Sequence, residues 1–422
     1  MSSSSLTLSR RGLGLDFAQP ALARKFQPAR GMELVDLLSL GIVPGMAGGA
    51  GGFNTTGDLV TRTTDGLDLN VLWNEFMAVN EEYNRQRQAV VDFLTYSVAS
   101  PIEEVPLTQG SGNFEEASEF GVPRAYRTEV SSYSMGYGFK WYDLANRFTW
   151  QFLADASAAQ VRNVENIALE ADSRLVFQKV MRQLFRNVTD SASIRGNPYN
   201  VYGFYNGEGG EAGTPPPYKT NTFAAGHNHF LVSGGTVVDP IDLQDMQVHL
   251  AHHGYERING YRTVLMVNRV EANAIRLFRS QVNGGPTGAL FDFIPAQGQP
   301  GVLIPQDIQV LGPGQVPATL NGLNVIGSYG DILIVEEDYI PAGYMVMFVT
   351  GGRDNLQNPI GFREHSSPGL RGMRLIKGRN ADYPLMDAYY VRGFGTGVRH
   401  RGAGVVMQIK ASGTYAPPAQ FA

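Results

Sequence analysis

Residues 150–186 read WQFLADASAAQVRNVENIALEADSRLVFQKVMRQLFR, and they are the most informative stretch of this 422-residue chain. They lie within a run of 57 residues, from Phe139 to Arg195, that contains no glycine and no proline, although the whole chain holds 50 glycines and 23 prolines. Glycine interrupts helices through its backbone entropy, and proline through its missing N–H. We therefore predict one long helix over Trp150–Arg186, about 55 Å long at 1.5 Å rise per residue.

Apolar residues mark one side of this predicted helix. Val161, Val164, Ala168, Ala171 and Leu175 follow the 3–4–3–4 spacing of a helix face, and charged side chains fall mostly elsewhere. Such a helix packs one face on a sheet. A helix of this length would span a compact globule of the same chain. We therefore interpret it as the central support of an extended subunit that packs beside copies of itself.

The segments around this helix differ in character. Residues 67–100 also lack glycine and proline and have helical spacing, whereas proline and glycine punctuate the chain from Pro101 onward. The stretch Val130–Tyr142 (VSSYSMGYGFKWY) alternates as a strand does, so we expect a long two-stranded hairpin that rests on something else. Asp239-Pro240 predicts the start of a further helix that stops at Gly254. Strands then alternate with turns towards the C-terminus, which indicates an α+β fold.

Composition excludes several classes of protein. The chain has no cysteine, which excludes disulfides and thiolate metal sites and fits assembly in a reducing cytoplasm. A net charge of −5 argues against a dedicated nucleic-acid binder. No apolar run reaches 18 residues, so we expect no membrane span.

Candidate catalytic residues are few. His249, His252 and His253 share part of the helix after Asp239, and they would be the core of a metal-dependent hydrolase, the alternative from another functional class. Zinc needs further ligands; His227 and His229 could supply them, but they lie in a loop-rich insertion at residues 196–235, and the chain has no HExxH motif. A solvated histidine face is the simpler interpretation. We find no phosphate loop and no nucleophile elbow, and we expect no metal, no cofactor and no enzymatic activity.

One charge pattern extends over two distant regions. Residues 101–129 hold six glutamates against two arginines, and residues 363–410 hold seven arginines and two lysines against three acidic residues. We interpret the first as an acidic hairpin that docks on the basic region of a neighbouring copy. The predicted acidic contact residues are Glu103, Glu104, Glu115, Glu116 and Glu119, and the predicted basic ones are Arg371, Arg374, Lys377, Arg392, Arg399 and Arg401.

This order of segments resembles the major capsid protein of tailed bacteriophages, whose shell fold is shared with encapsulins. The resemblance covers roughly residues 60–415. Its closest local likenesses are Ser97–Pro106, Asp331–Gly352 (DILIVEEDYIPAGYMVMFVTGG) and Val391–Ile409 (VRGFGTGVRHRGAGVVMQI). Some members form covalent cross-links through a lysine on the extended loop. This chain has six lysines but none between 101 and 129, so we do not expect it to cross-link in this way.

The resemblance implies a division of the chain into six parts. These are an N-terminal arm at 1–65, a helical segment at 66–100, an extended β-hairpin loop at 101–145, a peripheral domain at 146–235 that contains the spine helix 150–186 and a loop insertion, a mixed axial domain at 236–350, and closing peripheral strands with a C-terminal tail at 351–422.

The resemblance also implies a function. The subunits would self-assemble as hexamers and pentamers into an icosahedral head, in the host cytoplasm, and would enclose double-stranded DNA without reading its sequence. Further partners would be portal and scaffolding proteins and possible decoration proteins. No membrane is expected among the partners. An encapsulin-like compartment shell is the alternative with the same fold.

Overall fold

The computed structural model describes residues 61–421, except 86–88, 110–115, 117–118, 120, 122–128, 195, 211, 298–315, 321–322 and 379–386. Nearly all of the predicted N-terminal arm, and the tip of the predicted hairpin with Glu115, lie outside these ranges. Within them, no helix combines the length and the apolar character needed to cross a bilayer.

The chain divides into two compact units, each built from separated segments. The first takes the chain up to Val79, Leu144–Ile167 and Leu375–Tyr390, and the second takes the remainder. Each unit joins early and late parts of the chain. The predicted division of the chain into six parts remains a prediction.

The core of the first unit lies between helices. Helix α5 (Leu69–Arg85) buries Leu72, Trp73 and Phe76 together with Leu153 and Val161. Exposed Val71 and Met77 lie on the other side of α5, so only one face of this helix joins the core.

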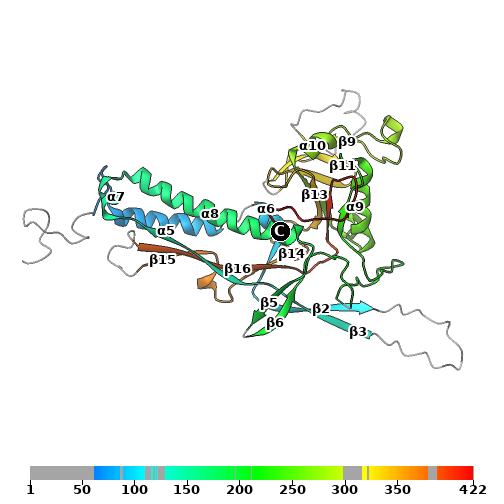
Figure 1. Ribbon diagram of the computed structural model, residues 1–422, viewed down its shortest axis with the longest axis horizontal. Coiled ribbons are helices and arrows are strands. Elements are labelled where there is room, and N and C mark those ends of the chain that lie inside the picture. Colours follow the sequence, from blue (N-terminus) through cyan, green and yellow to red (C-terminus); the bar gives the residue numbers. More distant parts are fainter. Residues whose placement is uncertain are drawn as a thin grey trace, which may run out of the picture. The chain divides into compact units, whose positions relative to one another are not determined.

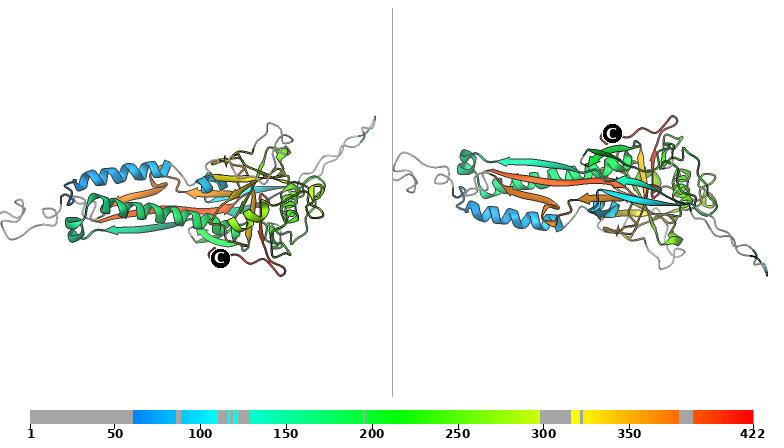
Figure 2. Two further views of the ribbon diagram at one scale, coloured as in Figure 1. Left: turned by 90° about the horizontal axis from the view of Figure 1, so that it is seen from above. Right: turned by 90° about the horizontal axis from the view of Figure 1, so that it is seen from below.

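The predicted unbroken helix over Trp150–Arg186 was wrong. A short helix α7 (Trp150–Asp155) ends at Ala156, which has extended backbone angles, and the long helix α8 (Ala158–Phe185) begins two residues later. Ser157 and Gln160 form reciprocal contacts at the start of α8: the Ser157 amide donates to the Gln160 side chain at 2.8 Å, and the Gln160 amide donates to the Ser157 hydroxyl at 3.4 Å. The amide of Ala158 also donates to the Asp65 carboxylate at 3.1 Å, which satisfies another helix-terminal N–H group. Helix α8 contains 28 residues, and Figure 2 shows it as one continuous coil.

The second unit contains an eight-stranded mixed sheet with a core on each face. Its strand order is β10-β11-β12-β8-β13-β17-β7, and β9 pairs with β11. The central strands β8 (RTVLMV) and β13 (YMVMFVT) are almost continuously apolar because both faces are covered. Val264 and Met266 of β8 join the core that contains the C-terminal part of α8, and Leu265 and Val267 join the core that contains α9 and α10. Helices α9 and α10 lie beside this sheet in Figure 1. The bounds are β7 Phe230–Val232, α9 Pro240–His252, β8 Arg262–Val267, α10 Arg269–Ile275, β9 Phe293–Pro295, β10 Thr319–Leu320, β11 Leu323–Tyr329, β12 Ile332–Glu336, β13 Tyr344–Thr350 and β17 Gly404–Gln408.

A five-stranded sheet joins strands from opposite ends of the sequence. Its order is β1-β14-β16-β15, and β4 also pairs with β16. Strand β1 follows the short helix α6 directly and runs parallel to β14, more than 260 residues later in the chain. The bounds are α6 Ala89–Leu94, β1 Thr95–Val98, β4 Lys140–Arg147, β14 Ile360–Glu364, β15 Met373–Lys377 and β16 Asp387–Val398.

Two antiparallel strand pairs complete the second unit. The predicted hairpin is present as β2 (Ile102–Gln109) and β3 (Glu129–Gly136), paired from Ile102 opposite Gly136 to Gln109 opposite Glu129. A second pair, β5 (Asp190–Ile194) and β6 (Asn197–Val201), follows α8. Tyr133 and Met135 of β3 pack with Tyr137 and Tyr202 in a small buried cluster, which gives the hairpin the support that an isolated one lacks.

Candidate subunit-contact surfaces and a histidine cluster

The base of the β2–β3 hairpin carries two predicted acidic contact residues, and the strand pleat separates them. Glu104 is exposed, whereas Glu103 is half-buried. The Tyr137 hydroxyl donates to one carboxylate oxygen of Glu103 at 2.5 Å, and Arg399 Nη1 lies 3.5 Å from the other. Glu103 and Arg399 were each predicted as subunit contacts, and here they pair with one another within one subunit.

Further along the predicted hairpin, Glu116 and Glu119 are both exposed. Their carboxylates are accessible to a partner. Together with Glu104 they are the acidic residues on which a docking proposal can rest.

Arg401 is buried, with 2% of its surface exposed. Its guanidinium lies between the rings of Tyr202 and Tyr205, 4.6 and 4.5 Å from their centroids, and donates to the backbone carbonyls of Gly203 and Ala212. Burial lowers the pKa of this guanidinium. Arg401 thus fixes the loop insertion to its own subunit and is too buried to contact a neighbouring copy.

Arg392 is also buried, at 8% exposure. It forms an ion pair with Asp172 of α8, and the Tyr83 hydroxyl donates to the same carboxylate at 2.8 Å. Desolvation, followed by the Asp172 charge, raises the pKa of Tyr83 to about 12. Like Arg401, Arg392 is therefore held inside its own subunit, here by an ion pair with α8.

The remaining predicted basic residues lie on or beside β15 and are more accessible. Arg371 is exposed and donates to the carbonyls of His365 and Ser366, and Arg374 is half-buried and donates to the carbonyl of Pro368. These bonds hold the guanidinium groups in place without neutralising them. Arg371 and Arg374 also line a pocket of about 240 Å³ with Glu364. Lys377 is exposed, with its Nζ 5.9 Å from the Trp73 ring centroid.

A larger basic groove was missed by the sequence reasoning. It has a volume of about 720 Å³ and lies between the C-terminal half of α8, the β5–β6 pair and the strands β4 and β16. Its basic lining residues are Lys140, Lys179, Arg182, Arg186 and Arg363. Asp190 lines it too and pairs with Arg186. Desolvation and then the neighbouring Arg182 and Lys140 lower the pKa of Lys179, as expected where like charges converge.

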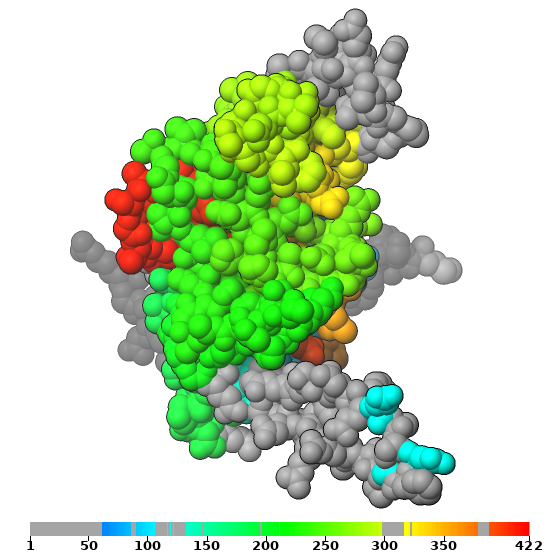
Figure 3. Space-filling model, turned by 90° about the vertical axis from the view of Figure 1, so that its right-hand side faces the viewer, coloured from blue at the N-terminus to red at the C-terminus, as the bar shows by residue number. Residues whose placement is uncertain are grey.

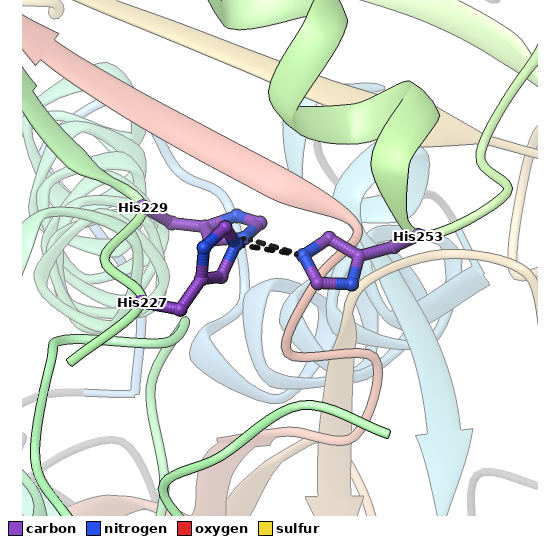
Figure 4. Close-up of side chains that lie close together, drawn as sticks. All are labelled: His227, His229 and His253. Carbon is purple, nitrogen blue, oxygen red and sulfur yellow. Dashed lines mark hydrogen bonds between the residues drawn. The ribbon is translucent and has the colours of Figure 1, made fainter. Parts of the chain in front are cut away.

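The histidines are arranged differently from the prediction. The expected solvated face was wrong for His253, which turns inward to meet His227 and His229, while His249 and His252 stay outside this trio. The three Nε2 atoms lie 3.1 Å apart between His227 and His229, 3.0 Å between His227 and His253, and 2.9 Å between His229 and His253. Figure 4 shows the three rings directed at one point.

Two parts of the fold bring this trio together. His253 caps the C-terminus of α9 and precedes Gly254, whose φ of 84° lets the chain turn away. His229 directly precedes β7; its amide donates to Tyr205 and its carbonyl accepts from Val406 of β17. The two histidines from the insertion thus face the end of α9, and in Figure 3 the insertion and α9 form one continuous surface.

No family model matches the chain, and no curated protein matches it either. Among solved structures, a chain from Mycobacterium phage Patience is 46% identical, with 90% of this chain and 98% of that chain covered and a TM-score of 0.68. The chain belongs to the family of tailed-phage major capsid proteins. Weaker similarities include the capsid of a native GTA particle (11% identity, 77% of this chain and 92% of that chain, TM-score 0.42). Another is the holo-SrpI encapsulin complex from Synechococcus elongatus PCC 7942 (12% identity, 77% of this chain and 88% of that chain, TM-score 0.40).

Membership of this capsid family settles the broad role of the chain. It is a structural protein of the virion that associates with copies of itself into a shell. The encapsulin and hydrolase alternatives are less well supported.

In this capsid protein the sequence analysis did not identify the basic groove, and it named His227, His229 and His253 as possible ligands without predicting that these three meet. The basic groove had a partial signal, since Lys179, Arg182 and Arg186 recur at helical spacing at the end of the long helix. The histidine trio had a weaker one, because His227 and His229 are separated from His253 by a loop whose path no local pattern specifies.

Proposed function

We propose that this capsid protein assembles as hexamers and pentamers into the icosahedral head of a tailed double-stranded DNA phage. The observation that carries this proposal is the 46% identity to a phage chain, over 98% of that chain's length. A shared sequence of this extent preserves the core and the surfaces on which a common assembly depends. The role is mechanical, and no step of it requires catalysis.

We further propose that the shell forms in the host cytoplasm, around a scaffold and a portal, and that decoration proteins can bind its outside. The packaged DNA is held without sequence recognition. A net charge of −5 supports this view, because strong phosphate binding by the inner wall would hinder DNA packing.

Neighbouring subunits are held in this proposal by the acidic hairpin. Exposed Glu104, Glu116 and Glu119 of one copy would meet Arg371, Arg374 and Lys377 of the next, and the basic groove at the end of α8 is a second acceptor surface. Each exposed ion pair contributes only about 0–1 kcal/mol. Many such contacts around a closed shell add up while single subunits can still dissociate and correct their position.

Negative-stain microscopy of the purified full-length protein tests the proposal. The protein is expressed both alone and with a scaffold, and we expect closed, uniform shells in at least one of the two preparations. Tubes or stable monomers under both conditions would contradict it. Particles isolated from infected cells should contain phage DNA; particles that contain an enzyme cargo instead would support the encapsulin-like alternative, and a monomer with hydrolytic activity would support the hydrolase.

A further inference from the structure

The contacts within the histidine trio cannot all be satisfied by hydrogen bonds. A neutral imidazole nitrogen carries either a hydrogen or a lone pair. Each of the three Nε2 atoms is within 3.1 Å of the other two. With three atoms and two states, at least one pair must bring two lone pairs or two N–H groups together. Protonating a ring adds an N–H group and does not remove the conflict.

A second observation fixes one member of the trio in the form of a ligand. His229 is fully buried, and its Nδ1 lies 2.7 Å from the carbonyl oxygen of Gly404. Because a carbonyl only accepts, we assign the ring hydrogen to Nδ1, which leaves the lone pair on Nε2 directed at His227 and His253. A metal-bound histidine is typically held by this kind of hydrogen bond through its other nitrogen.

We propose that His227, His229 and His253 bind a divalent transition-metal ion, with Zn²⁺ as the natural candidate, through their Nε2 atoms. A cation at the convergence point accepts all three lone pairs at once and removes the conflict. Tetrahedral zinc with Zn–N bonds of about 2.0–2.1 Å places its ligand nitrogens about 3.3 Å apart. The distances of 2.9–3.1 Å need to widen only slightly.

The donor set selects the class of metal. It consists of three imidazoles, and no carboxylate of the described residues joins the cluster. Imidazole suits zinc, copper, cobalt and nickel, whereas calcium and magnesium require oxygen ligands.

Neighbouring aromatic rings orient the ligands. Phe223 stacks on His253 with ring centroids 4.4 Å apart and 17° between the planes, and Tyr205 lies 5.8 Å from the same ring. Arg401 lies over Tyr205, and its guanidinium hydrogen-bonds to backbone carbonyls of the insertion. Three protein ligands leave the fourth position for water or for His249, whose ring centroid is 5.9 Å from that of His227.

The bound ion would act as a structural cross-link within the capsid subunit. His227 and His229 belong to the insertion, and His253 to the end of α9, so one ion would join a segment with little regular structure to the helix packed on the eight-stranded sheet. Binding to the folded state alone stabilises it in proportion to the logarithm of metal concentration over Kd. The inference does not depend on the assembly proposed above.

Metal analysis of the untagged full-length protein tests it. The protein is stripped with a chelator, titrated with Zn²⁺ alone, dialysed and analysed for metal per chain, and Co²⁺ is used in parallel as a spectroscopic probe of tetrahedral geometry. We expect one ion per chain, an intense visible Co²⁺ spectrum and a higher Tm with metal. Failure of the wild-type protein to retain stoichiometric Zn²⁺ would overturn the proposal.

Variants assign the ligands. His227→Gln removes a half-buried loop ligand and should lower Zn²⁺ affinity at least about 100-fold, since even outer partners of a metal ligand are worth 10–100-fold. His229→Gln should do the same, and if burial of His229 prevents that variant from folding, H227Q alone decides. The control is His365→Gln, a histidine outside the trio, which should bind one ion as the wild type does. Unchanged binding by folded H227Q would refute the assignment.

Discussion

At the scale of single residues, the interior of the second unit depends on a buried ion pair. The side chains of Arg392 and Asp172 are 9% and 6% exposed, and each neutralises the other. Taking two charges out of water is costly, and their mutual attraction offsets this only while both remain. The pair as a whole therefore adds little net stability in comparison with apolar packing. Removing one partner alone is nevertheless strongly destabilising.

We expect Arg392→Met to destabilise the subunit by about 3–5 kcal/mol, because the Asp172 carboxylate is then buried without its cation. Urea unfolding of the unassembled subunit measures this. Exposed Arg371→Met is the control and should cost about 0.5 kcal/mol or less. The double variant R392M/D172L should recover most of the loss, and a double variant as unstable as R392M would show that the charge pair is not the cause.

A second residue-scale feature is a chain of hydroxyl groups at the hairpin base. The hydroxyl oxygens of Tyr96 and Tyr137 lie 2.8 Å apart, and Tyr137 donates to Glu103. Desolvation raises the pKa of Tyr96 to about 12 and that of Tyr137 further in the same direction. The folded state therefore keeps protons that the unfolded chain loses near pH 10.

It follows that the stability that Tyr96 contributes is complete below pH 10 and is lost as the pH rises from 10 to about 12. The expected loss for Tyr96 is about 1.4 kcal/mol per pH unit in that window. Urea midpoints between pH 8 and 11 measure it, and Tyr96→Phe, which has no titrating hydroxyl, should lose correspondingly less. Parallel pH profiles for the two proteins would contradict the assignment.

At the scale of elements, α8 links the buried cores of both units. Its residue Val161 is fully buried in the first unit, and Val180 and Leu184 are fully buried in the second. A break within α8 would disturb both sets of contacts.

Ala168→Pro should therefore abolish soluble protein. Ala168 is 5% exposed inside α8, and proline there removes one hydrogen bond and clashes with the preceding turn, at a cost of about 3 kcal/mol or more. The control is Ala159→Pro, at an exposed position in the first turn, where proline is far better tolerated. The soluble fraction after expression is the measurement, and soluble, assembled A168P would contradict the role given to this helix.

The sequence predicts this element only in part. Absence of glycine and proline correctly indicated helix over most of Trp150–Arg186, but it says nothing about where a helix starts. The break at Ala156 had a local signal, the Ser157–Gln160 capping box, and a distant one, Asp65, which no local pattern connects to it. The capping signal Asp239-Pro240 was read correctly and does begin α9.

The candidate sites show the same limit. Charge counts located acidic and basic regions, but they could not tell exposed Arg371 from buried Arg392, because burial depends on pairing with Asp172 far away in the chain. The histidine trio likewise depends on how the insertion returns to the end of α9. Long-range pairing, which dominates this fold, is the information that residue spacing lacks.

At the scale of the whole molecule, the proposed shell depends on complementary charge between copies. The hairpin presents exposed Glu116 and Glu119, and the basic partners Arg371 and Lys377 are exposed as well. If the hairpin charges were reversed, like charges would face each other at every such contact. The repulsive energy of one contact would then be repeated over the whole shell.

We expect the double reversal Glu116→Lys and Glu119→Lys to block shell assembly and to leave the subunit folded, because both side chains are exposed and their loss opens no cavity. Sedimentation and negative-stain microscopy measure assembly, and circular dichroism confirms the fold. The matched control is Glu81→Lys with Glu82→Lys on α5, which makes the same change in net charge at two exposed positions that pair with Arg85. If the control assembles and the hairpin variant does not, charge at the hairpin is required. Adding Arg371→Glu and Arg374→Glu should then restore shells, since the attraction is rebuilt with opposite signs; normal shells from the hairpin variant alone would remove the docking hypothesis.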